Sequence, residues 1–252
     1  MPRSNTPTWE REERAVLKIR DLSSGYGGVR VLRGLSLDLA AGEVLGLLGR
    51  NGAGKTTALK TIMGLVEATD GSIELDGEEL RDLPAYQVPK RGLAYVPQGR
   101  RLFGEMSVAE NLRIGCLVRD TGQDTLDGIL ELFPILIERM AQRAGNLSGG
   151  EQQMLAVARA LCLGPKVLLM DEPTEGLMPS MIDTILETVS LLKARGVAVL
   201  LVEQKVEAAL NVADRIAFLE HGEIPASATP EALHADPGPL QRYIGVGLQG
   251  VN

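Results

Sequence analysis

The sequence predicts an α/β protein in which helices cover a mostly parallel sheet. Hydrophobic residues make up 44% of the 252 residues and aromatic residues only 3%, so the core must consist largely of Leu, Val, Ile and Ala. Such aliphatic side chains fill parallel sheets whose two faces are both buried. Continuous apolar runs recur along the chain, separated by segments with helical spacing. These runs cover residues 44–48, 93–96, 167–170, 197–202 and 216–219.

Composition and charge exclude several classes of protein. The net charge of −7 argues against a nucleic-acid duplex or an anionic membrane surface as a directly bound partner. No run approaches the roughly 18 to 20 apolar residues of a spanning helix, and residues 1–14 lack a signal-peptide core. We therefore expect a cytoplasmic chain with a flexible leader. Cys116 and Cys162 lie in apolar runs without metal-like spacing, which indicates reduced thiols.

The first part of the chain is predicted to form an edge-forming β region. Residues 16–19 and 31–39 have the composition of short strands, with a glycine-rich turn at 25–28. Residues 73–77 read as a strand that enters an Asp-Gly hairpin turn. Between these segments, the buried strand 44–48 leads through a glycine-rich loop into residues 55–65, which have helical spacing.

The middle of the chain is predicted to be helical. Residues 107–163 contain no convincing strand, and their helix-like segments are 108–114, 126–140 and 151–161. Alternation of strand and helix then resumes, with a helix at 181–194. We expect one domain over residues 15–247 and a tail at 248–252. Its core comprises residues 15–97 and 164–235, and residues 98–163 form an inserted helical subdomain.

Residues 49–56, Gly-Arg-Asn-Gly-Ala-Gly-Lys-Thr, match the phosphate-binding loop pattern G-x-x-x-x-G-K-[ST]. The loop lies where its chemistry requires, between a buried strand and a helix. Its glycines let backbone N–H groups turn toward phosphate oxygens, and the helix N-terminus adds a positive dipole. Lys55 would reach the β and γ oxygens, and the Thr56 hydroxyl would hold Mg²⁺. A glycine-rich turn without a ligand is the competing interpretation.

Two further segments carry candidate chemistry. The apolar run 167–170 ends in Asp171 and Glu172, which is weak evidence alone but specific beside a phosphate loop. There Asp171 would hold the Mg²⁺ shell, and Glu172 would act as general base on the attacking water. In residues 147–153, Leu-Ser-Gly-Gly-Glu-Gln-Gln, the spacing of Ser148 and Glu151 is that of a capping box. The paired glycines also bare a helix N-terminus to an anion, which favours a second phosphate site.

The phosphate loop, LSGGEQQ and VLLMDEP in this order resemble the ATP-binding subunits of ABC transporters, and the resemblance covers residues 16–245. It implies a P-loop NTPase fold: a RecA-like, mostly parallel core, an antiparallel β subdomain and an inserted helical subdomain. It also implies ATP and Mg²⁺ as ligands. The catalytic unit would be a dimer with two ATP molecules sandwiched head to tail.

The resemblance implies individual roles as well. Tyr26 would stack on adenine, and Gln98 would contact Mg²⁺ and the attacking water. Ser148, Gly149 and Gly150 would bind the γ-phosphate of ATP held by a second copy. The implied nucleotide contacts are Tyr26, Gly49, Asn51, Gly52, Ala53, Gly54, Lys55, Thr56, Thr57, Ser148, Gly149, Gly150 and Glu151. The implied magnesium ligands are Thr56, Gln98 and Asp171, and the implied catalytic residues are Glu172, Gln204 and Gln98.

Within the family, residues 95–103, 171–179 and 201–204 look like those of branched-chain amino acid importers and their urea and short-chain amide relatives. Two departures from the common ABC pattern stand out. Glu175-Gly176-Leu177-Met178 replaces Ser-Ala-Leu-Asp, and Gln204 stands where a histidine is expected to contact the γ-phosphate. An amide there can orient a phosphate or water by hydrogen bonds but cannot become cationic.

The leading interpretation is an ATPase subunit that drives a membrane importer. Its implied partners are a second ATPase subunit, identical or paralogous, two permease subunits and, indirectly, a solute-binding protein; no nucleic acid is expected. The implied location is the cytoplasmic face of the membrane. A soluble ABC ATPase of DNA repair or translation remains the alternative. Against it, Gly49 and Ser148 lie too close in sequence for a long coiled coil, and the chain holds one cassette.

Overall fold

The computed structural model describes residues 15–245, so the predicted leader and tail lie outside the described residues. Two sheets form its centre. The larger has the strand order β10-β9-β3-β8-β7-β6, with β10 antiparallel to β9 and all other neighbours parallel. Its strands are β3 (Val44–Leu48), β6 (Leu93–Val96), β7 (Val167–Asp171), β8 (Ala198–Val202), β9 (Arg215–Glu220) and β10 (Glu223–Ala228). The predicted mostly parallel α/β core is therefore confirmed.

The smaller sheet is antiparallel and has the order β2-β1-β4-β5. Its strands are β1 (Ala15–Tyr26), β2 (Val29–Ala40), β4 (Ala68–Leu75) and β5 (Glu78–Glu79). The antiparallel region was predicted correctly, but β1 and β2 are longer than expected because bulges let them stay paired past Ser24. The turn is confined to Gly27 and Gly28, whereas Gly25 lies within β1.

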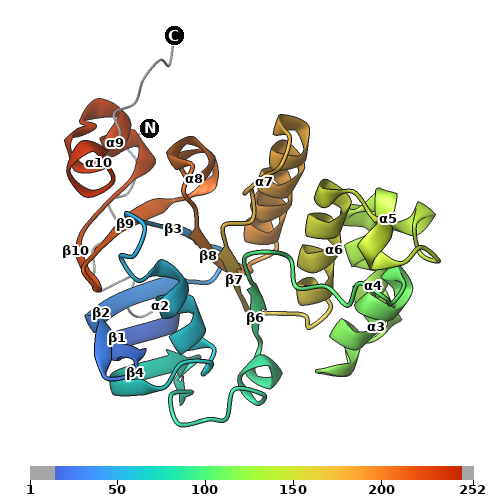
Figure 1. Ribbon diagram of the computed structural model, residues 1–252, viewed down its shortest axis with the longest axis horizontal. Helices are drawn as coiled ribbons and strands as arrows, with labels where there is room; N and C mark the ends of the chain where they lie inside the picture. Colours follow the sequence, from blue (N-terminus) through green and yellow to red (C-terminus); the bar gives the residue numbers. More distant parts are fainter. Residues whose placement is uncertain (1–14, 246–252) are drawn as a thin grey trace.

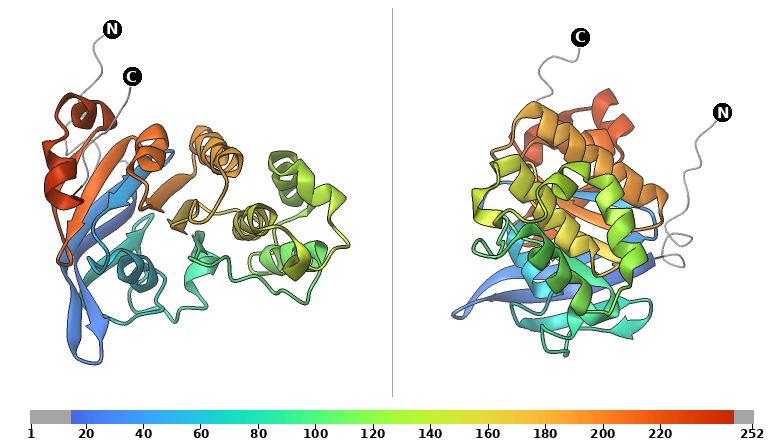
Figure 2. Two further views of the ribbon diagram at one scale, coloured as in Figure 1. Left: turned by 45° about the horizontal axis from the view of Figure 1, so that its top comes forward. Right: turned by 90° about the vertical axis from the view of Figure 1, so that its right-hand side faces the viewer.

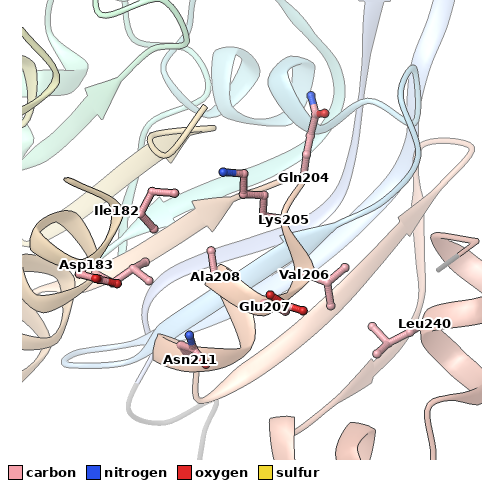
Figure 3. A pocket seen from close by; sticks show the side chains of 10 residues that line it. Ile182, Asp183, Gln204, Lys205, Val206, Glu207, Ala208, Asn211 and Leu240 are labelled. Atoms are coloured by element: carbon pink, nitrogen blue, oxygen red, sulfur yellow. The ribbon is translucent and has the colours of Figure 1, made fainter. Parts of the chain in front are cut away.

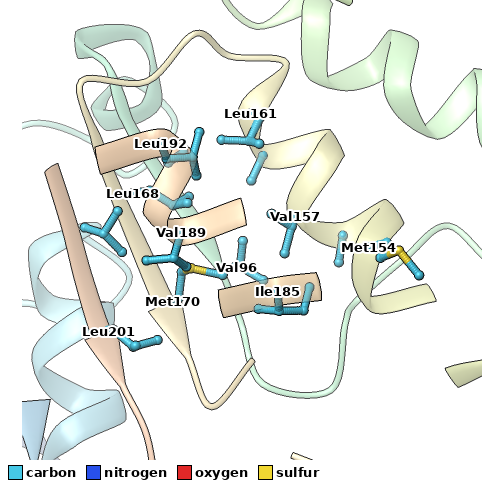
Figure 4. Packing of buried hydrophobic residues seen from close by; sticks show 14 of the residues in the cluster. Val96, Met154, Val157, Leu161, Leu168, Met170, Ile185, Val189, Leu192 and Leu201 are labelled. Atoms are coloured by element: carbon cyan, nitrogen blue, oxygen red, sulfur yellow. The ribbon is translucent and has the colours of Figure 1, made fainter. Parts of the chain in front are cut away.

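Both faces of the parallel sheet are buried, which explains its continuous apolar strands. Leu168 and Met170 of β7 pack in one hydrophobic cluster, and their neighbours Val167 and Leu169 pack in the other. The first cluster includes α6 (Gly149–Leu161) and α7 (Pro179–Ala194), as the close view in Figure 4 shows. The second joins this sheet to the antiparallel sheet through α2 (Lys55–Ile62).

Helices α3 to α6 form a lobe on the β6 side of the sheet, away from the antiparallel strands (Figures 1 and 2). The lobe contains α3 (Val108–Leu117), α4 (Gln123–Leu132), α5 (Pro134–Glu138) and a 3₁₀ turn at Ala144–Asn146. A single helix over 126–140 was wrong, because the chain breaks at Phe133 (φ −131°) before Pro134, whose ring disfavours helical geometry in the preceding residue.

Four elements in the last part of the chain were not predicted from the sequence. These are α8 (Val206–Val212), β10, α9 (Pro230–Ala235) and α10 (Gly238–Tyr243), and a 3₁₀ turn at Val88–Arg91 was missed as well. Helices of six or seven residues carry too few periodic positions to stand out in a sequence. Within residues 15–245, no helix is both long and apolar enough to cross a membrane.

The topology brings the candidate residues together. Strands β3, β8, β7 and β6 are neighbours in the parallel sheet, so their carboxyl ends meet at one edge. The phosphate loop follows β3, Gln204 follows β8 closely, Glu172 follows β7 and Gln98 follows β6. This edge is where open α/β sheets bind their ligands.

Candidate active site

The phosphate loop joins β3 to α2, and its backbone geometry requires glycine. Gly52 and Gly54 have φ angles of 81° and 112°, in the left-handed region that favours glycine. A Cβ on Gly49 would lie 2.3 Å from the Leu219 carbonyl oxygen, so β9 passes too close for any side chain. The hairpin after β9 also supports the loop, because the Gly222 N–H donates to the Ala53 carbonyl at 3.2 Å.

Lys55 lies inside the loop. Its ammonium donates to the carbonyl oxygens of Gly49 at 2.7 Å and Arg50 at 3.3 Å, and the residue is 6% exposed. Burial lowers the pKa of Lys55, while Glu172 and Asp171 oppose that shift. A cation shielded from water in this way can interact strongly with phosphate oxygens.

Thr56 and Asp171 are brought together across the sheet edge. The Thr56 hydroxyl donates to Asp171 Oδ1 at 3.1 Å, and the Tyr95 hydroxyl donates to Asp171 Oδ2 at 3.1 Å. Burial raises the pKa of Asp171, and burial together with Asp171 raises the pKa of Tyr95. Sequence reasoning missed Tyr95; pairing of residues 93–96 with 167–170 in adjacent strands is the signal that could have found it.

The Thr56–Asp171 pair fits a magnesium ion. Oxygen ligands on adjacent vertices of a magnesium octahedron lie about 3 Å apart, close to the 3.1 Å between Thr56 Oγ1 and Asp171 Oδ1. Among residues 15–245, no three His, Cys, Asp or Glu side chains gather into a cage for a metal. That is compatible with magnesium, which usually takes one or two protein ligands and completes its shell with phosphate and water.

Glu172 receives two amide groups on one oxygen. Gln98 Nε2 donates to Glu172 Oε2 at 3.0 Å, and Gln204 Nε2 donates to the same oxygen at 2.7 Å. Gln98 Nε2 also donates to Glu175 Oε2 at 2.9 Å, a contact that sequence reasoning missed. The Gln98 amide thus hydrogen-bonds to the carboxylates of Glu172 and Glu175 and not to the Thr56–Asp171 pair. Figure 3 shows the Gln204 side chain leading away from the side chains of α8.

The Ser148 segment caps α6. Ser148 Oγ accepts the Glu151 N–H at 3.3 Å, and Glu151 Oε2 accepts the Ser148 N–H at 2.8 Å, which makes the predicted capping box. The bond from the Ser148 N–H to the carboxylate lowers the pKa of Glu151. A Cβ on Gly149 would lie 2.9 Å from the Arg100 guanidinium, and one on Gly150 would lie 2.7 Å from Met181. Within its own chain this segment therefore packs against the side chains of Arg100 and Met181.

The remaining predicted contacts are spread around the loop. Tyr26 ends β1, and its side chain is 50% exposed, free to meet a planar ligand. Asn51 and Gly52 are exposed, Ala53 is partly buried, and Thr57 is buried in the first turn of α2.

Comparisons with known proteins agree with these features. The family described as ABC transporter matches residues 32–175. The high-affinity branched-chain amino acid transport ATP-binding protein BraG of Pseudomonas aeruginosa is 45% identical over 91% of this chain and 100% of its own length. A probable branched-chain amino acid transport ATP-binding protein, LivF of Archaeoglobus fulgidus, is 37% identical over 86% of this chain and 94% of its own. The solved ADP conformation of an ABC transporter cassette has a TM-score of 0.81 and 26% identity, and covers 92% of this chain and 99% of that one.

Proposed function

The chain belongs to the ABC transporter family, and from that membership we propose that it hydrolyses ATP as the energy-coupling subunit of a membrane importer. The convergence of Gln98 and Gln204 on Glu172, beside Lys55 and the Thr56–Asp171 pair, is the observation that carries the proposal. A carboxylate held by two amides next to a phosphate loop is suited to orient and deprotonate a water that attacks phosphorus.

Each residue has a part in the proposed reaction. Lys55 and the loop N–H groups bind the β and γ oxygens, and Tyr26 stacks on the base. Thr56 and Asp171, with Gln98, would hold Mg²⁺, which when bound would neutralise charge on the phosphates. Glu172 takes the proton of the attacking water, and Gln204 orients the carboxylate or a γ-phosphate oxygen.

The proposed active unit is a dimer. The Ser148 segment packs on its own Arg100 and Met181, while its helix N-terminus and two glycines form a suitable anion site. We propose that this segment closes over ATP bound to the phosphate loop of a second subunit, either identical or paralogous. Nucleotide-dependent dimerisation is the property to measure.

Gln204→Ala should lower ATP turnover on the order of 10²-fold or more while ATP affinity changes little, because the amide contacts Glu172 rather than the phosphate loop. Gln204→His should be tolerated and should introduce a new inflection near pH 6.5, the ordinary imidazole range, that the wild type lacks. The measurement is the turnover rate of all three proteins between about pH 6 and 8. Full activity in the Gln204→Ala protein would mean that Gln204 has no role in hydrolysis.

A groove beside Gln98 is the proposed docking site for the permease. It has a volume of about 490 Å³ and is lined largely by apolar residues of the segments 86–103, 114–118 and 156–163. Phe103 lies in it with 49% of its surface exposed, below the Arg159 guanidinium at 5.3 Å. The side-chain amide of buried Asn111 fixes the Phe103 backbone. Its oxygen accepts the Phe103 N–H, and its Nδ2 donates to the Phe103 carbonyl, both at 3.1 Å. A groove built on the segment that carries Gln98 could report ATP occupancy to the membrane subunits.

Phe103→Asp should uncouple the subunit from the permease without unfolding it, since the side chain is half exposed. Binding to detergent-solubilised permease should fall at least about tenfold, because a charge would be desolvated in an apolar interface. Leu191→Asp, a change at a comparably exposed apolar residue on α7, is the matched control and should leave binding intact. Normal assembly with the permease and normal solute-stimulated ATPase activity in the Phe103→Asp variant would refute the proposal that this groove is the docking site.

Branched-chain amino acids are the proposed solutes, on the strength of the 45% identity to BraG over its whole length. Urea or short-chain amides are the alternative within the same importer group. The proposed location is the cytoplasmic face of the membrane, held there by two permease subunits. Uptake of radiolabelled leucine, urea and acetamide by vesicles carrying the assembled transporter decides among the solutes. Failure to co-purify with detergent-solubilised permease subunits would favour a soluble role.

A further inference from the structure

Glu203 is a buried carboxylate that has no part in the proposed reaction so far. It directly follows β8 and precedes Gln204, and it is 2% exposed. Burial raises the pKa of Glu203, and the hydrogen bond from the Thr174 backbone opposes that shift. An acidic side chain is costly to bury unless hydrogen bonds compensate. The buried Glu203 carboxylate therefore depends on its hydrogen-bond donors.

The donor that Glu203 binds lies on a different loop. Glu203 Oε1 accepts the backbone N–H of Thr174 at 3.0 Å, and Thr174 is itself fully buried. Glu203 itself lies on the loop after β8, directly before Gln204. One side chain thus joins the loop after β7 to the loop after β8, the neighbouring strand.

The loop after β7 is a tight turn that presents Glu172. Glu172 has a φ angle of 50°, a left-handed conformation uncommon for a residue other than glycine. Its N–H donates to the Val202 carbonyl at 2.9 Å, and the Glu175 N–H donates to the Glu172 carbonyl at 3.2 Å. Thr174 lies inside this turn, so fixing its N–H fixes the turn. Strained conformations of this kind persist where surrounding contacts hold them.

We propose that Glu203 is a positioning residue for ATP hydrolysis. By binding the Thr174 N–H from the position next to Gln204, it holds together the two loops in which the Glu172 carboxylate lies 2.7 Å from the Gln204 amide. The inference rests on the proposed function, because it requires Glu172 to act on ATP. A misplacement of about 1 Å at a reacting group can cost on the order of 10²-fold in rate. The acceptor oxygen, rather than the negative charge, performs this task.

Three substitutions separate the acceptor from the charge. Glu203→Gln keeps an oxygen at the same reach without charge, Glu203→Asp keeps the charge but shortens the side chain, and Glu203→Met keeps neither. We expect the kcat of the Gln variant to stay within about threefold of the wild type and that of the Asp and Met variants to fall by about tenfold or more. The KM for ATP should change by less than about twofold, because the phosphate loop is untouched.

The experiment measures steady-state ATP hydrolysis by the full-length chain, with thermal unfolding as a check on folding. Glu207→Gln, an exposed change on nearby α8, is the control and should have no effect. Wild-type kcat in the Met variant, Asp more active than Gln, or KM rising in step with the loss of kcat would each overturn the proposal. If the Met variant fails to fold, the order of Gln and Asp still decides. A wild type without ATPase activity would instead refute the proposed function itself.

Discussion

Replacing Glu172 with Gln should leave ATP binding unchanged and lower turnover about 10³-fold. The amide has the shape of the carboxylate but cannot accept the proton of the attacking water. Lys55, Thr56 and Asp171 keep their contacts in this variant, because none of them hydrogen-bonds to Glu172. The loss should therefore fall on kcat and not on the dissociation constant for ATP.

Single-turnover hydrolysis and equilibrium binding of a fluorescent ATP analogue measure the two quantities separately. Glu187→Gln is a suitable control, because this exposed carboxylate lies on α7 and makes no contact with the nucleotide site. Hydrolysis by the Glu172 variant at the wild-type rate would mean that the general base lies elsewhere.

Lys55→Ala should remove both hydrolysis and most of the affinity for ATP. The ammonium is buried in the loop, where its attraction to phosphate is poorly screened by water. Charge-assisted hydrogen bonds of this kind contribute about 1.5 to 3 kcal/mol each, which corresponds to about 10- to 100-fold in the dissociation constant. Turnover should fall below detection, because the same cation stabilises the charge that develops on the γ-phosphate.

Isothermal titration with ATP and a phosphate-release assay test this expectation. Lys193→Ala, which removes a half-exposed lysine paired with Asp214, is the matched control and should leave both readouts unchanged. If the Lys55 variant retained near-normal turnover, the loop would not be the site of ATP hydrolysis.

Long apolar strands were the most predictable part of the fold. The parallel sheet buries both of its faces, so β3, β7 and β8 appear in the sequence as continuous apolar runs. The ends of the antiparallel strands β1 and β2 were harder to predict. Strand β1 continues through Ser23, Ser24 and Gly25 by means of bulges, which sequence composition does not reveal. Short helices such as α8 depend on tertiary packing more than on their own residues.

The residues of the candidate site also differ in how far the sequence could predict them. Lys55, Thr56, Asp171 and Glu172 follow from local motifs whose chemistry depends on spacing in the sequence. Tyr95, Glu175 and Glu203 enter through strand pairing and loop packing between segments distant in sequence, and no local pattern marks them. Gln204 was identified through the resemblance to the ABC family, as the residue in place of the expected histidine, and the apolar run 197–202 before it supported that position.

The molar mass and nucleotide content of the Glu172→Gln chain test the central claim most directly, namely that Glu172 drives hydrolysis of ATP shared between two subunits. Size-exclusion chromatography with light scattering gives the mass, and the eluted nucleotide is identified after denaturation. The account predicts a particle of two chains with two intact ATP molecules in the presence of ATP, and single chains in ADP. ADP recovered from the ATP sample would contradict it, and so would single chains in both nucleotides when the chain is tested alone and together with a paralogous ATPase subunit.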